Sequence, residues 1–185
     1  MKTFFKGFCI GLLSLSLLGL LWFLVLQPGL TNKEAQDLKE EYAQPLPGES
    51  SGELPAGKEQ AASLVNLSAL QAEYPDIKGW ISIPGTCVDY PVLQSSADEP
   101  EYYLRRTYKG EHRTAGSIFF QWDCSPESRN LVVYGHNMSD GTMFAVLQKM
   151  ADEAFRTEHS KILLQTSDGL WEYRIAAVLK TDITK

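Results

Sequence analysis

Cysteine and histidine are scarce in this sequence. The 185 residues contain three of each, with no C-x-x-C spacing and no Cys/His cluster. This excludes the usual ligand sets of structural zinc, and we expect neither a metal nor a cofactor. Cys9 lies in an apolar run, so only Cys87 and Cys124 could pair in an oxidising compartment. We expect these two thiols to be unpaired and half-buried, because two cysteines do not make a disulfide framework.

An excess of positive charge is also missing. The formal net charge is -6, with 17 basic and 23 acidic residues. A protein that binds the phosphate backbone normally presents a basic surface. We therefore expect no nucleic-acid partner.

Charge is absent altogether from residues 7–26, "GFCIGLLSLSLLGLLWFLVL". Twenty helical residues span about 30 Å, the thickness of a bilayer's hydrocarbon core. The alternative is a cleaved signal peptide, whose apolar region is usually shorter and ends at a small-x-small site, whereas "QPGL" follows here. Because Lys2 and Lys6 precede the run, we predict a single-pass cell-membrane anchor with a cytoplasmic N-terminus and an extracellular domain.

Composition divides the chain into three parts. Residues 1–30 are the predicted cytoplasmic stub and anchor. Residues 31–60 are predicted to be a juxtamembrane stalk, with a solvated helix over 32–44, followed by a linker in which "PLPGESSGELPAGKEQ" holds three prolines and three glycines. Residues 61–185 are predicted to form the folded domain, which begins with a helix over 61–74 that Pro75 ends.

Beyond Pro75 the pattern is that of short strands separated by turns. Six strands and one convincing helix favour a mostly β barrel or sandwich over alternating β-α units. The helix is expected in "GTMFAVLQKM", residues 141–150, with Ser139 or Asp140 as its cap. The expected strands are 79–83, 88–93, 117–120, 130–134, 161–166 and 170–181.

His136 is the strongest candidate for a chemical role. It stands in "NLVVYGHNMSDGTMF", residues 130–144, where a strand ends at Gly135 and a polar turn follows. Gly135 permits a sharp turn that leaves the imidazole near the rim of a sheet, and an imidazole exchanges protons near neutral pH. The alternative is a histidine that only satisfies a turn by hydrogen bonding. His112 is expected on the surface, and His159 at a helix-to-strand junction.

The cysteines are poor nucleophile candidates. Cys124 lies beside Asp123 and near Glu127, whose negative charge suppresses the reactive thiolate. Cys87 enters a predicted strand at a turn and is expected to pack.

Three separated segments carry a family resemblance. In order, "DIKGWISIPGTCVDYPVLQ" (76–94), "YYLRRTYKGEHRTAGSIFF" (102–120) and "NLVVYGHNMSDGTMF" (130–144) resemble the class B sortases, membrane-anchored cysteine transpeptidases of Gram-positive bacteria. The resemblance covers about residues 66–181. It implies a sortase-like β-barrel, here incomplete, preceded by helices.

The resemblance also implies a function. In that family a cysteine attacks the sorting-signal peptide of a surface protein, and an amine of a cell-wall precursor or of a pilin resolves the thioacyl enzyme. His136 matches the family's general acid/base, and Leu104 and Tyr134 match positions that line the substrate-binding groove. The asparagine often found before "YL" in the family is absent from "DEPEYYL", so recognition of the signal is expected to differ.

Another departure is more serious. The family's nucleophile lies in a T-L-x-T-C motif with an arginine further on, and neither motif occurs before Lys185. We expect these 185 residues to be a catalytically inactive fragment of a sortase. The alternative is a real short protein, a non-catalytic, membrane-anchored binding module. A metal-dependent hydrolase is disfavoured, because no second ligand stands at a suitable spacing from His136.

Overall fold

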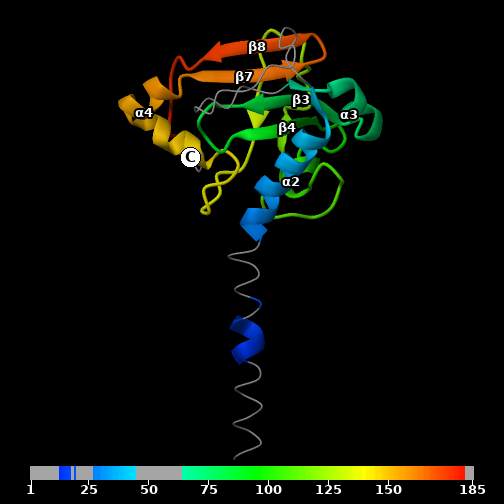
Figure 1. The fold of residues 1–185 in the computed structure, drawn as a ribbon, viewed down its shortest axis with the longest axis vertical. Helices are drawn as coiled ribbons and strands as arrows, with labels where there is room; N and C mark the ends of the chain where they lie inside the picture. The colour runs from blue at the N-terminus through cyan, green and yellow to red at the C-terminus, as the bar shows by residue number, and fades with distance from the viewer. Residues whose placement is uncertain (1–12, 18, 20–26, 45–63, 182–185) are drawn as a thin grey trace, which may run out of the picture.

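The computed structural model describes residues 13–17, 19, 27–44 and 64–181. The described part is mostly β and centres on a six-stranded sheet in the order β6-β5-β4-β3-β7-β8 (Figure 1). Its strands are β3 (Ile77–Ser82), β4 (Asp89–Gln94), β5 (Ile118–Phe120), β6 (Val133–Tyr134), β7 (Lys161–Thr166) and β8 (Gly169–Arg174). Neighbouring strands are antiparallel except β4 and β5, which are parallel. The mostly β prediction is confirmed.

Both faces of the central strands are buried. Successive side chains of a strand point to opposite faces, so neighbouring residues of one strand enter different hydrophobic clusters. Ile118 and Phe120 pack in one hydrophobic cluster, and Phe119 between them packs in another. The first cluster extends over Val88, Val92, Met143 and Met150, and the second over Leu67, Leu70, Ile77, Trp80 and Leu93. The sheet is therefore the middle layer of the domain.

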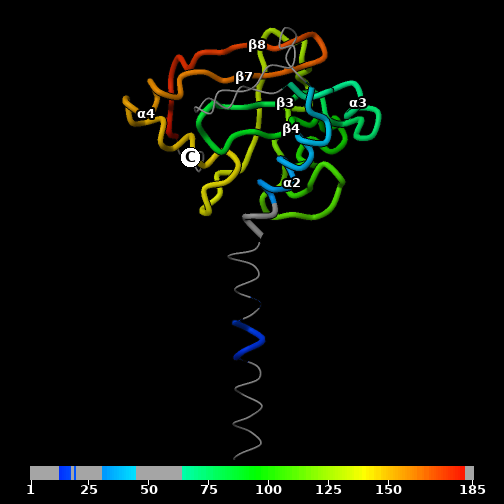
Figure 2. The backbone as a smooth tube through the Cα atoms, in the orientation of Figure 1, coloured from blue at the N-terminus to red at the C-terminus, as the bar shows by residue number. Residues whose placement is uncertain are grey.

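The helices are short and lie around the sheet. They are α2 (Gln27–Glu41), α3 (Leu67–Glu73), the 3-10 helices η2 (Tyr102–Arg105) and η3 (Ala145–Ala151), and α4 (Glu153–Glu158). Two two-residue strands, β1 (Ala43–Gln44) and β2 (Leu64–Val65), pair separately. Figure 2 follows the long connection from β4 to β5, which carries η2.

The first helix differs from its prediction. Residues 32–44 were expected to form a solvated helix or stalk, but α2 packs beside β4 and buries Thr31, Ala35 and Leu38. Lys39 forms an ion pair with Asp89 of β4 at 2.7 Å. The solvated-helix prediction is therefore wrong, because one narrow face of α2 is part of the core.

Other boundaries also differ from the predictions. The helix expected over 61–74 is α3, which starts only after Asn66, whose side chain caps it by accepting from the Ala69 N–H at 3.1 Å. The helix expected over 141–150 is the 3-10 helix η3, and Asp140 bonds Thr142 instead of capping it. The strand expected over 170–181 ends at Arg174.

Most of the predicted membrane segment, residues 7–26, falls outside the described residues. Among the residues that the structure describes, no helix is long and apolar enough to cross a bilayer. The predicted linker also lies largely outside the described ranges. The division at residues 30 and 60 stays a prediction.

Candidate active site

His136 lies just beyond β6, where the chain passes close to two core side chains. A Cβ on Gly135 would lie 2.5 Å from Cδ1 of Ile118 and 2.6 Å from Cδ2 of Phe144. Glycine is therefore required here for close packing, whereas we had expected it for a sharp turn. The backbone of His136 is held as well, because its carbonyl accepts the N–H of Phe144 at 2.9 Å.

The turn after His136 is closed and strained. An isolated bridge joins Asn137 to Met143, and Met143 has φ 56°, a left-handed conformation that costs a residue with a side chain about 1–2 kcal/mol. The Met143 N–H donates to the hydroxyl of Tyr90 at 3.1 Å, which holds this conformation in place. Strain of this kind gathers at functional sites when the surroundings enforce it.

The imidazole of His136 is partly buried and reaches η2. Its Nε2 lies 2.8 Å from the backbone carbonyl oxygen of Leu104. The structure thus brings together two of the three predicted site residues, which stand 32 positions apart in the chain. The bond joins the ring to a distant segment and not to its own turn, which was the role left open as the alternative. Leu104, which accepts this bond, also lines a groove.

The groove has a volume of about 450 Å³ and includes the third predicted residue, Tyr134. Its lining is Pro100, Glu101, Leu104, Phe119, Gln121, Trp122 and Tyr134. The Tyr134 hydroxyl donates to Oε1 of Gln121 at 2.9 Å, and its ring packs 5.4 Å from that of Phe119. Leu104 and Tyr134 therefore line one groove, and the Leu104 carbonyl contacts the His136 ring. The assignment of all three as functional residues stays a prediction.

Gln121 and Trp122 also line the groove, and neither was predicted as a site residue. They follow β5 directly, and Trp122 is 48% exposed, an unusual position for so large an apolar side chain. An exposed indole beside a groove offers a contact surface to a peptide. The signal in the sequence was a tryptophan in a polar loop, "QWDCSPES".

The two cysteines are unpaired and partly buried, as predicted. The Cys87 thiol donates to the carbonyl of Gly141 at 3.1 Å, and burial raises its pKa above the ordinary value. The Cys124 thiol contacts the carbonyl of Asn130 at 3.5 Å. Neither has a described hydrogen bond to His136, so the described contacts contain no thiol–imidazole pair.

The remaining histidines have the surroundings expected of them. His112 is exposed. His159 ends α4, where Nδ1 lies 2.9 Å from the carbonyl of Pro84 and the ring packs against Phe155. Within the described ranges, no group of three His, Cys, Asp or Glu side chains could hold a metal ion.

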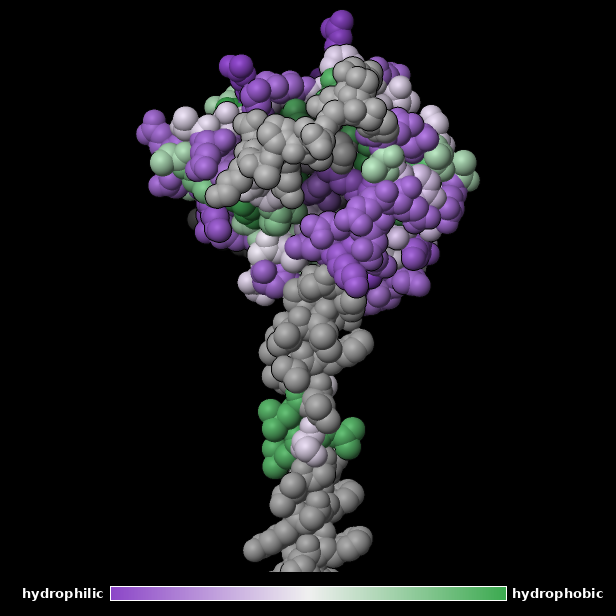
Figure 3. Space-filling view, in the orientation of Figure 1, coloured by the Kyte–Doolittle hydropathy of each residue, from purple (hydrophilic) through white to green (hydrophobic). Residues whose placement is uncertain are grey.

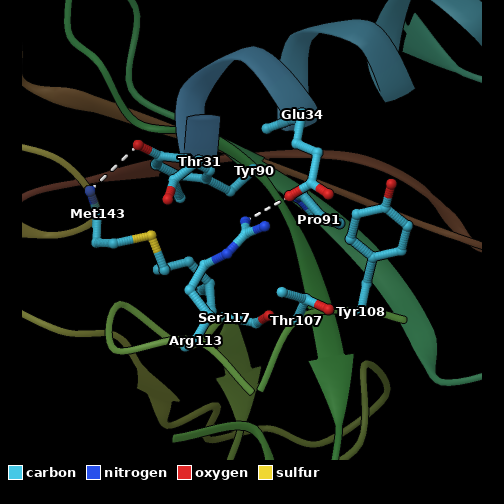
Figure 4. Close-up of a pocket in the computed structure, with 12 residues that line it drawn as sticks. Thr31, Glu34, Tyr90, Pro91, Thr107, Tyr108, Arg113, Ser117 and Met143 are labelled. Atoms are coloured by element: carbon cyan, nitrogen blue, oxygen red, sulfur yellow. Dashed lines mark hydrogen bonds and ion pairs between the residues drawn. The ribbon is translucent and has the colours of Figure 1, made fainter. Parts of the chain in front are cut away.

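A second, much smaller cavity lies between α2 and the sheet, and the side chains that line it leave little empty space (Figure 4). Arg113 forms an ion pair with Glu34 across it, and its volume of about 30 Å³ holds about one water molecule. The Tyr90 hydroxyl at its edge donates to Asn32 of α2, and burial raises its pKa to about 12. This cavity joins α2 to the strained turn after His136 and leaves no room for a substrate.

Comparison with known proteins shows the family of the chain. The sortase domain model matches residues 81–185. Sortase B of Listeria monocytogenes is 40% identical, and that of Staphylococcus aureus 33% identical, over 117 residues, which are 62% of this chain and 47% of each relative. The chain therefore spans about half the length of these curated relatives.

Solved structures give the same result. A Bacillus anthracis protein described as similar to sortase B superposes with a TM-score of 0.62 at 31% identity, over 87% of this chain and 75% of that one. A structure of Listeria monocytogenes sortase B superposes with a TM-score of 0.53 at 40% identity, over 60% of this chain and 63% of the other. The chain belongs to the sortase family, and these similarities place it with class B.

Proposed function

We propose that the protein is a sortase-type cysteine transpeptidase, which cleaves a C-terminal sorting signal and transfers the protein to an amine of the cell wall or of a pilin. The observation that supports this most directly is the His136 ring, whose Nε2 is held by the carbonyl of Leu104, a residue that lines a groove of about 450 Å³. One matched Staphylococcus aureus sortase B structure is a substrate complex, and another sortase B is complexed with triglycine. Both ligand classes are consistent with an acyl donor peptide and an amine acceptor.

The chemistry proceeds in two steps. A thiolate attacks the scissile carbonyl, and as the C–N bond breaks, His136 gives a proton to the departing amine. The incoming amine then attacks the thioester and gives a proton back to His136 as the C–S bond breaks. The imidazole ends in the state in which it began, so one histidine serves both steps.

We further propose that neither Cys87 nor Cys124 is the nucleophile. The raised pKa of the Cys87 thiol leaves little thiolate at neutral pH, and its proton already donates to a carbonyl. Three arginines are engaged elsewhere: Arg105 with the Thr114 carbonyl, Arg106 with Gly110 and the Tyr102 ring, and Arg113 with Glu34. The attacking thiol and the cation that stabilises the oxyanion are proposed to come from sequence outside these 185 residues.

Membrane attachment through residues 7–26, with the domain outside the cell, is part of the same proposal. It rests on the uncharged run and the two preceding lysines. Figure 3 shows mainly hydrophilic side chains on the visible face of the domain, whereas the described part of this segment exposes Leu13, Leu15 and Leu17. Removal of residues 1–26 should release the domain from membranes while leaving all of α2 in place.

A cleavage assay tests the function. The 185-residue chain and a version extended by the coding sequence that follows Lys185 are each given a peptide with a Thr–Gly or Thr–Asn bond and an amine acceptor. We expect the extended version alone to cleave and transfer. His136→Ala should abolish turnover, and His112→Ala, which alters an exposed histidine, should leave it unchanged.

Two results would contradict the proposal. One is an extended sequence that provides no thiol needed for turnover. The other is near-normal turnover by His136→Ala, which would make the imidazole purely structural. Peptide binding by the extended version without any cleavage would instead support the binding-module alternative.

A further inference from the structure

The contact between His136 and Leu104 determines where the proton sits on the neutral ring. A carbonyl oxygen can only accept a hydrogen bond, and it lies 2.8 Å from Nε2. Nε2 must therefore carry the hydrogen. In the neutral imidazole the other nitrogen, Nδ1, then holds the free lone pair.

We propose that the Leu104 carbonyl fixes His136 in the Nε2–H form, so that Nδ1 is the atom that exchanges the proton during the reaction. The exchange role rests on the proposed function, whereas the position of the hydrogen does not. During acyl transfer the Nδ1–H of the imidazolium gives its proton to the departing amine nitrogen. The Nδ1 lone pair then takes a proton from the attacking amine. The Nε2–H bond to Leu104 stays intact throughout.

The carbonyl is held by the way η2 packs on the chain before β5. The Ser117 N–H donates to the carbonyl of Tyr103 at 3.0 Å, and the Leu104 N–H donates to that of Glu101 at 2.9 Å. Gly116, at φ 56°, lies directly against the carbonyls of Tyr103 and Leu104. A Cβ at Gly116 would stand 2.3 Å from the Leu104 oxygen and 2.6 Å from the Tyr103 oxygen.

Gly116 is therefore a positioning residue for the imidazole. Only a residue without Cβ allows the chain to approach η2 this closely and to adopt a positive φ without strain. Any larger residue must displace the Leu104 carbonyl or its own backbone. Displacement of the carbonyl would release the Nε2–H, because the structure shows no second partner for the ring in its described surroundings.

Nuclear magnetic resonance of the full 185-residue chain with ¹⁵N-labelled histidine tests this directly. The signals are assigned by the loss of one set in His112→Gln and of another in His136→Gln. At a pH where His136 is neutral, we expect Nε2 to be the protonated nitrogen, with an N–H that exchanges slowly with water. We expect this form to dominate by about tenfold, the ratio that a hydrogen bond of about 1.4 kcal/mol gives. A predominant Nδ1–H form, or fast exchange of the Nε2–H with water, would overturn the proposal.

Two glycine variants extend the test. Gly116→Ala should reduce the preference for the Nε2–H form and speed its exchange with water. Gly141→Ala places alanine at a similarly positive φ of 86° with nothing within 4 Å of its Cβ, and should leave the ring signals unchanged. Equal ring signals in both variants would remove the positioning role of Gly116.

The measurement is independent of turnover. Should Gly116→Ala fail to fold, the unsubstituted chain still decides where the hydrogen sits. An inactive extended enzyme with an Nε2–H ring would count against the function alone, and an active enzyme with an Nδ1–H ring would count against this inference alone.

Discussion

The close approach at Gly116 predicts an unusually large effect on stability for the addition of one methyl group. Gly116 is buried and Gly141 is exposed, yet both have a positive φ. Replacing either by alanine incurs the cost of a left-handed L-residue, about 1–2 kcal/mol. Gly141→Ala should lower the free energy of unfolding by that amount and no more, because its Cβ would enter open space.

Gly116→Ala adds a steric term. Its Cβ would lie about 1 Å inside ordinary contact distance of the Leu104 oxygen, so the η2 backbone must move. Overpacking of this kind costs about 1–3 kcal/mol. The expected total is about 2–5 kcal/mol, a large fraction of the 5–15 kcal/mol by which a domain is usually stable.

Urea unfolding of the full chain, followed by tryptophan fluorescence, measures both variants. The comparison requires equal m values, so that a change in midpoint reports stability. A difference of at least about 1 kcal/mol between the variants is expected from the steric term. If the free energies of unfolding of the two variants fall by the same amount within about 0.5 kcal/mol, then η2 moves aside at no energetic cost. That result would refute the argument that the Leu104 carbonyl is rigidly held.

Two further predictions concern the packing of α2 and the state of Cys87. Leu38→Ala should lower the free energy of unfolding by about 2–5 kcal/mol, because it leaves a cavity under α2. Gln36→Ala, on the exposed face of the helix, should change that free energy by no more than about 0.5 kcal/mol. Similar changes in both variants would support a solvated helix instead. In the C9S/C124S variant, burial of the Cys87 thiol should make alkylation at about pH 8 slower than that of a model peptide thiol, since a raised pKa lowers the thiolate fraction until the pH rises further; a rate equal to the model peptide's would contradict this.

The strands could be predicted because their signals are local. β7 matches the expected range of 161–166, and β3, β4 and β5 match within two residues at each end. Each is a short run of apolar residues between turn residues. His136 was also found locally, since a histidine after a strand and a glycine stands out in any window of the sequence.

The packing of α2 could not be predicted in this way. Among residues 31–41 of α2, whose burial the structure describes, only Thr31, Ala35 and Leu38 are buried. This stripe is too narrow to distinguish the sequence from that of a solvated helix. The charged side chains of α2 were expected to face solvent. Two of them instead form ion pairs with distant residues: Lys39 with Asp89, 50 positions later, and Glu34 with Arg113. No window of neighbouring residues contains both members of such a pair.

The α-helix predicted over residues 141–150 is the 3-10 helix η3, which begins only at Ala145. Met143, Phe144, Leu147 and Met150 do have helical spacing, but Met143 is held at positive φ by its bond to Tyr90. A residue in that conformation cannot continue an α-helix. The bounds of the short helix α4 were not predicted, although His159 was expected at the end of a helix. None of the residues of α4 is buried, so its sequence has no apolar stripe.

The segment η2 connects the core to the candidate site, and this restricts how the groove can adapt. The Tyr103 side chain is buried in the second hydrophobic cluster and donates to Asp76 at 2.5 Å. The next residue, Leu104, lines the groove and holds His136 through its carbonyl. The buried Tyr103 side chain therefore limits how far the neighbouring Leu104 backbone can move away from the imidazole.

The side chains of the opposite wall are less buried. Trp122 is about half exposed, and its neighbour Gln121 is held in the groove by the exposed hydroxyl of Tyr134. Exposed side chains of this kind change rotamer at little cost, whereas a buried wall does not. Under the proposed function, differences between sorting-signal peptides should therefore be accommodated by the side chains of Gln121 and Trp122, while the η2 side keeps the imidazole at a constant position.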